Sequence, residues 1–139
     1  MLLIKTKVGP SSIEGAGLGL FADEFIAKGT LIWEVDPNFD VLVSKKNLED
    51  DFINYPESYR IFLKTYGYTK KEYPFIIICT DNARFVNHSK EGNMKGGEGN
   101  FSFMEQSYAS RDIYPGEELL EDYSSFDDKS MGEENNNYY

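Results

Sequence analysis

Short apolar segments separated by turn-forming residues are the feature of this sequence that most limits its fold. The longest uninterrupted apolar run, residues 75–79, has only five residues. A run of this length suits one buried strand and is far too short to cross a membrane. Further strand candidates are residues 2–8, 30–35, 101–103 and 118–123. The pattern therefore predicts a mainly β domain built from short strands.

One part of the chain has helical periodicity. Ser44 is a suitable N-cap for a short turn through Phe52. Pro56 suits the first turn of a second helix. The apolar residues that follow recur at the spacing of one helix face: Tyr59, Phe62, Leu63 and Tyr66. Gly67 is expected to end this helix in a left-handed cap. The expected architecture is a single domain of short strands with a helical insert.

Composition excludes several kinds of site. Cys79 is the only cysteine and His88 the only histidine, so neither a disulfide nor a cysteine- or histidine-based metal site is expected. The first apolar residues are too few for a signal peptide, and we expect a soluble cytoplasmic protein with no membrane partner. The net charge is −10, with the acidic excess concentrated in residues 81–139. An acidic surface repels nucleic-acid phosphates and attracts basic proteins, although it can also serve solubility alone.

A glycine-rich motif occupies residues 15–22, Gly-Ala-Gly-Leu-Gly-Leu-Phe-Ala. Closely spaced glycines let backbone groups approach a ligand without obstruction. Glu34 stands where a ribose-binding acid would stand in a dinucleotide-binding fold. However, the long loop after Val8 and the G-x-G-x-G spacing disagree with that fold. Taken alone, the motif is equally compatible with a plain hairpin turn.

Two further motifs follow: residues 84–89, Arg-Phe-Val-Asn-His-Ser, and residues 116–123, Gly-Glu-Glu-Leu-Leu-Glu-Asp-Tyr. A hydrolase would need a nucleophile in contact with His88, and directly adjacent Ser89 is poorly placed for that role. The acidic run in the last motif lacks the spacing of a calcium loop and is typical of a solvated face. Core packing is the ordinary role of a tyrosine at the end of a strand, such as Tyr123.

The ordered occurrence of these three motifs resembles the SET domain family of protein lysine methyltransferases. The resemblance covers roughly residues 3–126, and residues 8–13 and 33–40 are similar to small stand-alone SET proteins of bacterial type. It implies a SET fold (β-clip) of small curved sheets, whose last segment threads beneath a preceding loop as a pseudoknot. The expected organisation is a SET domain over residues 1–126. An acidic tail over residues 127–139 would be mobile or would cover the substrate channel.

The resemblance also implies a site for S-adenosylmethionine and a channel for a substrate lysine. Tyr123 matches the catalytic tyrosine and would help to orient the lysine nitrogen. Tyr66 or Tyr68 is the candidate for a second aromatic residue of the channel, although helical spacing favours core packing for Tyr66. The residues that would contact the cofactor are Gly17, Leu18, Gly19, Arg84, Phe85, Asn87, His88 and Tyr123.

The function implied by the resemblance is methyl transfer to a lysine side chain of a protein, leaving S-adenosylhomocysteine. The acidic charge favours a basic acceptor such as a histone, a histone-like protein or a ribosomal protein. Many relatives close the channel with a zinc-binding cysteine segment, and here Phe126 or the tyrosines at 138–139 would have to replace it. A partner or a homodimer would compensate for the small size of the domain. Two alternatives stay open: a non-catalytic acidic module that binds basic tails, and methylation of a group other than lysine.

Overall fold

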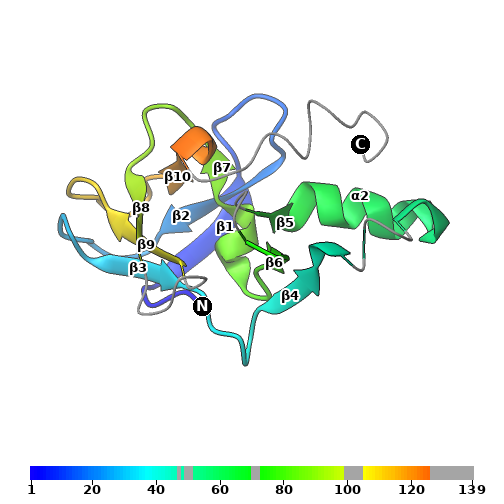
Figure 1. The fold of residues 1–139 in the computed structure, drawn as a ribbon. Helices are drawn as coiled ribbons and strands as arrows, with labels where there is room; N and C mark the ends of the chain where they lie inside the picture. The colour runs from blue at the N-terminus through cyan, green and yellow to red at the C-terminus, as the bar shows by residue number, and fades with distance from the viewer. Residues whose placement is uncertain (47, 49–51, 70–72, 99–104, 126–139) are drawn as a thin grey trace.

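Short strands form most of the secondary structure of the computed structural model, which describes residues 1–46, 48, 52–69, 73–98 and 105–125 (Figure 1). Within these residues the strands form three small sheets, with helix α2 (Glu57–Tyr66) lying to one side. The predicted mainly β architecture with a helical insert is confirmed. No helix in this part of the chain is long and apolar enough to span a membrane.

The first sheet is an antiparallel hairpin of β1 (Thr6–Pro10) and β2 (Leu18–Ala22). The predicted strand at 2–8 is therefore shifted along the chain, and residues 18–22 of the glycine motif are strand rather than loop. This strand is difficult to recognise from the sequence because glycine has no side chain, so the motif does not show the alternation of apolar and polar residues that is typical of a strand. Leu20 and Ala22 nevertheless alternate into the core, with 0% and 2% of their surface exposed.

The largest sheet has five strands, and its third and fourth strands are far apart in sequence. Strand β10 (Leu120–Glu121) lies parallel to both of its neighbours, β7 (Asn87–His88) and β8 (Met94–Glu98). The predicted strand at 118–123 is shorter than expected, because Tyr123 already begins the 3₁₀ helix η3 (Tyr123–Ser125). The candidate at 101–103 lies outside the described residues. In spatial order the strands are β3 (Leu31–Glu34), β9 (Glu105–Ala109), β8 (Met94–Glu98), β10 (Leu120–Glu121) and β7 (Asn87–His88).

The loop that joins β7 to β8 crosses over β10, because β10 is inserted between these two strands. Buried Asn93 holds the crossing segment: its Nδ2 donates to the carbonyl of Glu118 at 2.8 Å, and its Oδ1 accepts from the amide of Leu120 at 3.0 Å. The amide of Ser89 donates to the carbonyl of Glu121 at 3.1 Å. This arrangement is the pseudoknot that the resemblance implied.

The third sheet packs beside α2 and has the order β4 (Val41–Ser44), β6 (Phe75–Ile78), β5 (Gly67–Tyr68). Strand β6 is the predicted buried strand, and its antiparallel pairing with β4 was not expected from the sequence. Ser44 ends β4 and directly precedes helical residues at 45, 46 and 48, as the proposed N-cap requires. Phe52 begins the 3₁₀ helix η1 (Phe52–Asn54).

The predicted left-handed cap at Gly67 is wrong. Gly67 has φ −88° and ψ 140°, and it is the first residue of β5. Glycine is required here by close packing, since a Cβ atom would lie 2.5 Å from the carbonyl oxygen of Leu63 and 2.8 Å from Cγ2 of Ile76. The chain therefore turns from helix to strand without a left-handed residue.

Two apolar clusters form the core. The smaller one lies under α2 and contains Leu48, Phe52, Leu63, Ile76 and Ile78. The larger one joins the three sheets, and its members with less than 2% exposure are Leu20, Ile26, Ile32, Val35, Ile77, Ala109, Ile113 and Leu119. The motif residues of the sequence lie around this larger cluster, so its packing sets their relative positions.

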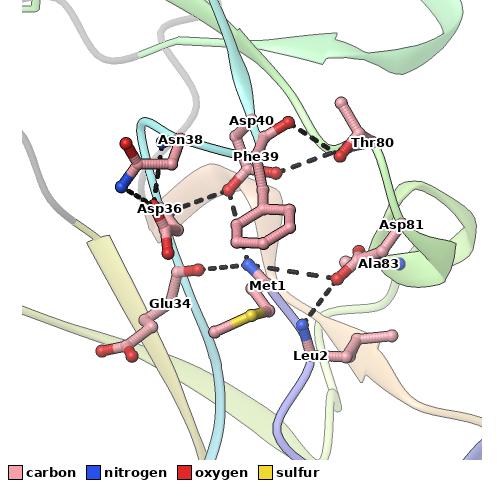
Figure 2. A network of polar contacts seen from close by, with 10 residues as sticks. All are labelled: Met1, Leu2, Glu34, Asp36, Asn38, Phe39, Asp40, Thr80, Asp81 and Ala83. Atoms are coloured by element: carbon pink, nitrogen blue, oxygen red, sulfur yellow. Dashed lines mark hydrogen bonds and ion pairs between the residues drawn. The ribbon is translucent and has the colours of Figure 1, made fainter.

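Two aspartates connect the first residues to the segment before β7 (Figure 2). Buried Asp40 accepts from the amide of Asp36 at 2.9 Å and from the ammonium of Met1 at 3.4 Å. Asp81 accepts from the amide of Leu2 at 2.6 Å and also caps the 3₁₀ helix η2 (Asn82–Phe85) by accepting from the amide of Ala83. Because η2 leads directly into β7, this network helps to place the second motif.

Gly67→Ala should destabilise the fold, because its methyl group would overlap backbone and side-chain atoms. We expect a loss of about 1–3 kcal/mol, measured by urea denaturation. Gly9→Ala is the matched control, since a Cβ at residue 9 meets only the Phe21 ring at 3.5 Å, an ordinary contact. Equal stability of the two variants would contradict the packing role of Gly67.

Candidate active site

The second and third motifs meet where β10 lies beside β7. Leu120 is paired with Asn87, and Glu121 is paired with His88. This pairing brings Tyr123 onto His88: the Tyr123 amide donates to Nδ1 of His88 at 3.1 Å, and the two ring centroids are 5.4 Å apart. Two motifs that are separated in sequence therefore form one wall.

Tyr123 is anchored at both ends. Its amide is held by His88, and its hydroxyl donates to the carbonyl of Val86, the residue before β7. In Figure 1, the short helix η3 that begins at Tyr123 lies beside β7 and β10. The side chain is therefore folded back along β7 in one defined orientation, which is what a residue that aligns reacting groups requires.

The glycine motif joins the same region through Asn87. Nδ2 of Asn87 donates to the carbonyl of Leu18 at 2.9 Å and to Oγ of Ser11 at 3.1 Å. Gly17 has φ 75°, and a Cβ there would meet no atom within 4 Å, so the loop backbone is open on this side. The backbone of the glycine loop and the side-chain amide of Asn87 are therefore neighbours, and their contact with a cofactor stays a prediction.

Glu118 is a central residue of this region that the sequence analysis missed. It is 8% exposed, and its carboxylate accepts from Oγ of Ser11 at 2.7 Å, the amide of Ser12 at 2.8 Å and Nδ2 of Asn87 at 3.2 Å. Burial raises the pKa of Glu118, but these hydrogen bonds outweigh it and hold the pKa below 4.5. Glu118 therefore connects the glycine loop to β7 as a carboxylate.

The expectation of a solvated acidic face fails at Glu118 and Glu121, which are 8% and 6% exposed. It holds for Glu117, whose carboxylate pairs with Arg111 at 2.6 Å. Glu118 forms an isolated antiparallel β-bridge with Phe21 of β2, and its Oε1 would lie only 2.1 Å from a Cβ atom at Gly19, so the carboxylate is packed directly against β2. The four acidic residues of this motif lie within eight positions, and nothing in the local sequence distinguishes the buried carboxylates from the exposed ones.

Arg84 and Phe85 lie together in η2. The Arg84 guanidinium stands over the Phe85 ring, 4.9 Å from its centroid, and Nη1 donates to the carbonyl of Thr80 at 3.1 Å. Phe85 also meets the edge of the Tyr66 ring at 6.2 Å. The contact between Phe85 and Tyr66 links η2 to α2, and contact of Arg84 or Phe85 with a cofactor stays a prediction.

The structure separates the two tyrosines proposed for the channel. The Tyr66 ring meets the Phe62 ring at a tilt of 52°, with centroids 5.2 Å apart, and packs against the smaller apolar cluster, as its helical spacing predicted. Tyr68 meets Trp33 edge-on at 6.1 Å. Burial, with nearby acidic groups, raises the pKa of Tyr68 well above its ordinary value. In the described part of the chain, no three His, Cys, Asp or Glu side chains are grouped to hold a metal ion.

Glu118→Gln should lower stability at pH 7 by about 1.5–3 kcal/mol, because an amide cannot accept hydrogen bonds on both of its ends. The folded pKa of Glu118 is lowered, so its contribution is present above pH 4.5 and is lost as the pH falls through the folded value. Urea denaturation across this range should therefore show the two proteins converging at acidic pH. A difference that persists unchanged below pH 4 would contradict the role of the charge.

Comparison with known proteins agrees with this arrangement. The chain resembles a subunit of Chaetomium thermophilum polycomb repressive complex 2 bound to S-adenosylmethionine, with 24% identity and a TM-score of 0.67 over 95% of this chain and 17% of that one. It also resembles a Plasmodium falciparum protein with a provisional assignment as a histone methyltransferase. That likeness has 22% identity and a TM-score of 0.60 over 88% of this chain and 95% of the other. This chain thus spans about a sixth of the Chaetomium chain.

A search of curated protein sequences finds no significant match. The family model for the SET domain matches residues 17–124, which include the glycine loop, the Asn-His pair and the final tyrosine. These are the segments that the fold brings together around β10. The chain therefore belongs to the SET domain family.

Proposed function

We propose that this protein transfers a methyl group from S-adenosylmethionine to a lysine side chain of a basic protein. The observation that best supports this function is the meeting of the three motifs around β10, with Tyr123 on His88 and Asn87 on the carbonyl of Leu18. The assignments of the two similar solved structures are consistent with it. The proposed catalytic domain is residues 1–126.

The cofactor would lie against the glycine loop and β7. Backbone groups of Gly17, Leu18 and Gly19 would contact it, Asn87 and His88 would hold its amino-acid and adenine ends, and Arg84 and Phe85 would complete this wall. Glu118 would act indirectly, since its carboxylate holds both Ser11 of the loop and Asn87. Cofactor affinity is therefore expected to depend on the same hydrogen bonds that hold the loop.

When bound, the cofactor supplies a methyl group on a sulfonium sulfur. An acceptor of this methyl group would need a free lone pair, so it would have to be a neutral amine. A lysine amine has an ordinary pKa of about 10.4, so its proton must first be released to water. A channel of aromatic side chains, with Tyr66 or Tyr68 beside Tyr123, would favour the neutral form by excluding water. Tyr123 would orient the nitrogen, because its own position is held by His88 and Val86.

A basic acceptor is favoured by acidic groups near Tyr123. Asp122 directly precedes Tyr123, and a hydrogen bond from Ser124 lowers the pKa of its carboxylate. Glu117 is also ionised at neutral pH, since the hydrogen bond from Arg111 lowers its pKa. Such charges steer a basic protein toward the site, with an effect that weakens as salt is added. Phe126 and residues 127–139, which were expected to close the channel, lie outside the described residues.

The test is methyl transfer from labelled S-adenosylmethionine to a panel of basic proteins. Tyr123→Phe should lose roughly a hundredfold in turnover, because misalignment of the reacting groups has an effect of about this size. Tyr114→Phe is the matched control: this tyrosine is 59% exposed and its ring meets the Phe25 ring at 5.4 Å, so the change removes a hydroxyl group from an exposed side chain. Mass spectrometry of the product identifies the methylated residue.

Absence of both methyl transfer and saturable cofactor binding would contradict the proposed enzyme activity and favour a module that holds basic tails. Label on a residue other than lysine would contradict the proposed acceptor. Full activity of Tyr123→Phe would contradict the assignment of the catalytic tyrosine while leaving the reaction in place.

A further inference from the structure

The contact between His88 and Tyr123 fixes the protonation state of the imidazole. The Tyr123 amide donates to Nδ1 of His88 at 3.1 Å, and the two rings lie 5.4 Å apart at an angle of 44°. A ring nitrogen can accept a hydrogen bond only while it carries no proton. We therefore assign His88 as a neutral imidazole whose proton is on Nε2.

The fold explains why the Tyr123 amide is held by a residue of β7. Tyr123 is the first residue of η3, and the amides of a first helical turn have no partner within their own helix. Strand β10 ends two residues earlier at Glu121, which is paired with His88. This register brings the imidazole to the beginning of η3. His88 thus connects β7 to the segment that carries the proposed catalytic tyrosine.

Asp122 is the alternative partner of the same ring nitrogen. Its Oδ1 lies 3.7 Å from Nδ1 of His88, which is too long for a hydrogen bond to the neutral ring. The hydrogen bond from Oγ of Ser124, at 2.7 Å, lowers the pKa of Asp122, so this carboxylate stays charged in weakly acidic solution. A protonated Nδ1 can no longer accept from Tyr123, but it can donate to Asp122.

Protons from solvent can reach this pair, since the side chains of His88 and Asp122 are 44% and 36% exposed. Two further charged groups belong to the neighbouring segments. Lys90 follows β7, and its charge also lowers the pKa of Asp122, whereas the Glu121 carboxylate accepts from Oγ of Ser107 at 3.0 Å. Histidine side chains ordinarily change charge between about pH 5 and 8. A change of partner at Nδ1 is therefore accessible near neutral pH.

We propose that His88 is a positioning residue for Tyr123: the neutral imidazole holds the Tyr123 amide, and on protonation Nδ1 turns to Asp122 and releases this end of the tyrosine. The inference rests on the proposed function, in which Tyr123 aligns the reacting groups. It gives His88 a role through Tyr123 besides the proposed contact with the cofactor. The hydrogen bond from the Tyr123 hydroxyl to the carbonyl of Val86 does not involve the imidazole, so protonation loosens the tyrosine at one end only.

Nuclear magnetic resonance tests the contact directly, because His88 is the only histidine and its ring nitrogens give the only imidazole signals. At pH 8 we expect the proton on Nε2 and a scalar coupling across the hydrogen bond between Nδ1 and the amide nitrogen of Tyr123. This coupling should disappear as the ring becomes protonated. Asp122→Asn should move the titration of the ring to lower pH, because the carboxylate favours the charged form. Glu57→Gln, the matched loss of charge from an exposed residue of α2, should not move it.

Two substitutions of His88 test its effect on methyl transfer at saturating cofactor. His88→Asn keeps an acceptor near the position of Nδ1 but does not titrate, whereas His88→Leu has no acceptor at any pH. At pH 8 the kcat of His88→Asn should equal that of the original protein, and the kcat of His88→Leu should be about fivefold lower, the effect of one lost hydrogen bond. Between pH 8 and 5 the original protein should lose about fivefold in kcat relative to His88→Asn, with an equal KM for the acceptor. Loss of the acceptor's own proton affects both proteins alike, so this ratio reports His88 alone.

A proton on Nδ1 at pH 8, no coupling to the Tyr123 amide, or the same pH dependence of kcat in the original protein and His88→Asn would each overturn the inference. The resonance measurements use the original protein and need no catalysis, so they decide the contact even if a variant fails to fold. Coupling without any methyl transfer would contradict the proposed function alone. Methyl transfer with full activity of His88→Leu would contradict the positioning role alone.

Discussion

The insertion of β10 between β7 and β8 is the constraint on which the rest of this structure depends. The strand has only two residues, Leu120 and Glu121, and it is paired on both sides. Buried Asn93 supplies further backbone hydrogen bonds to the same segment. Because buried backbone groups must be paired, this short segment cannot leave the sheet without exposing polar groups on both of its neighbours.

The position of β10 also places the chemical groups at its two ends. Glu118 lies before the strand and holds the glycine loop to Asn87, while Tyr123 follows the strand and lies on His88. Glu121 projects from the strand itself toward Ser107. One inserted segment thus carries the proposed cofactor support and the proposed catalytic tyrosine, which explains how a small domain can hold both.

Local patterns predicted part of the fold and of the site, and their limits have physical causes. The buried strand β6 and helix α2 were predicted because periodicity and apolar length are properties of neighbouring residues. Strand β2 was missed because the glycines of its motif carry no alternating side chains. Gly67 was assigned to a left-handed cap because close packing against Leu63 and Ile76 gives no signal in the sequence.

By itself, the sequence determined the class of fold, the three motifs and their order, since these depend on residue types and local spacing. Only the tertiary structure decided what each acidic residue of the last motif does. Glu117 is at the surface with Arg111, whereas Glu118 accepts a hydrogen bond from Ser11, a residue 107 positions away. The same carboxylate is a solvated charge or a buried acceptor according to the groups around it. Those groups come from distant segments that folding brings together.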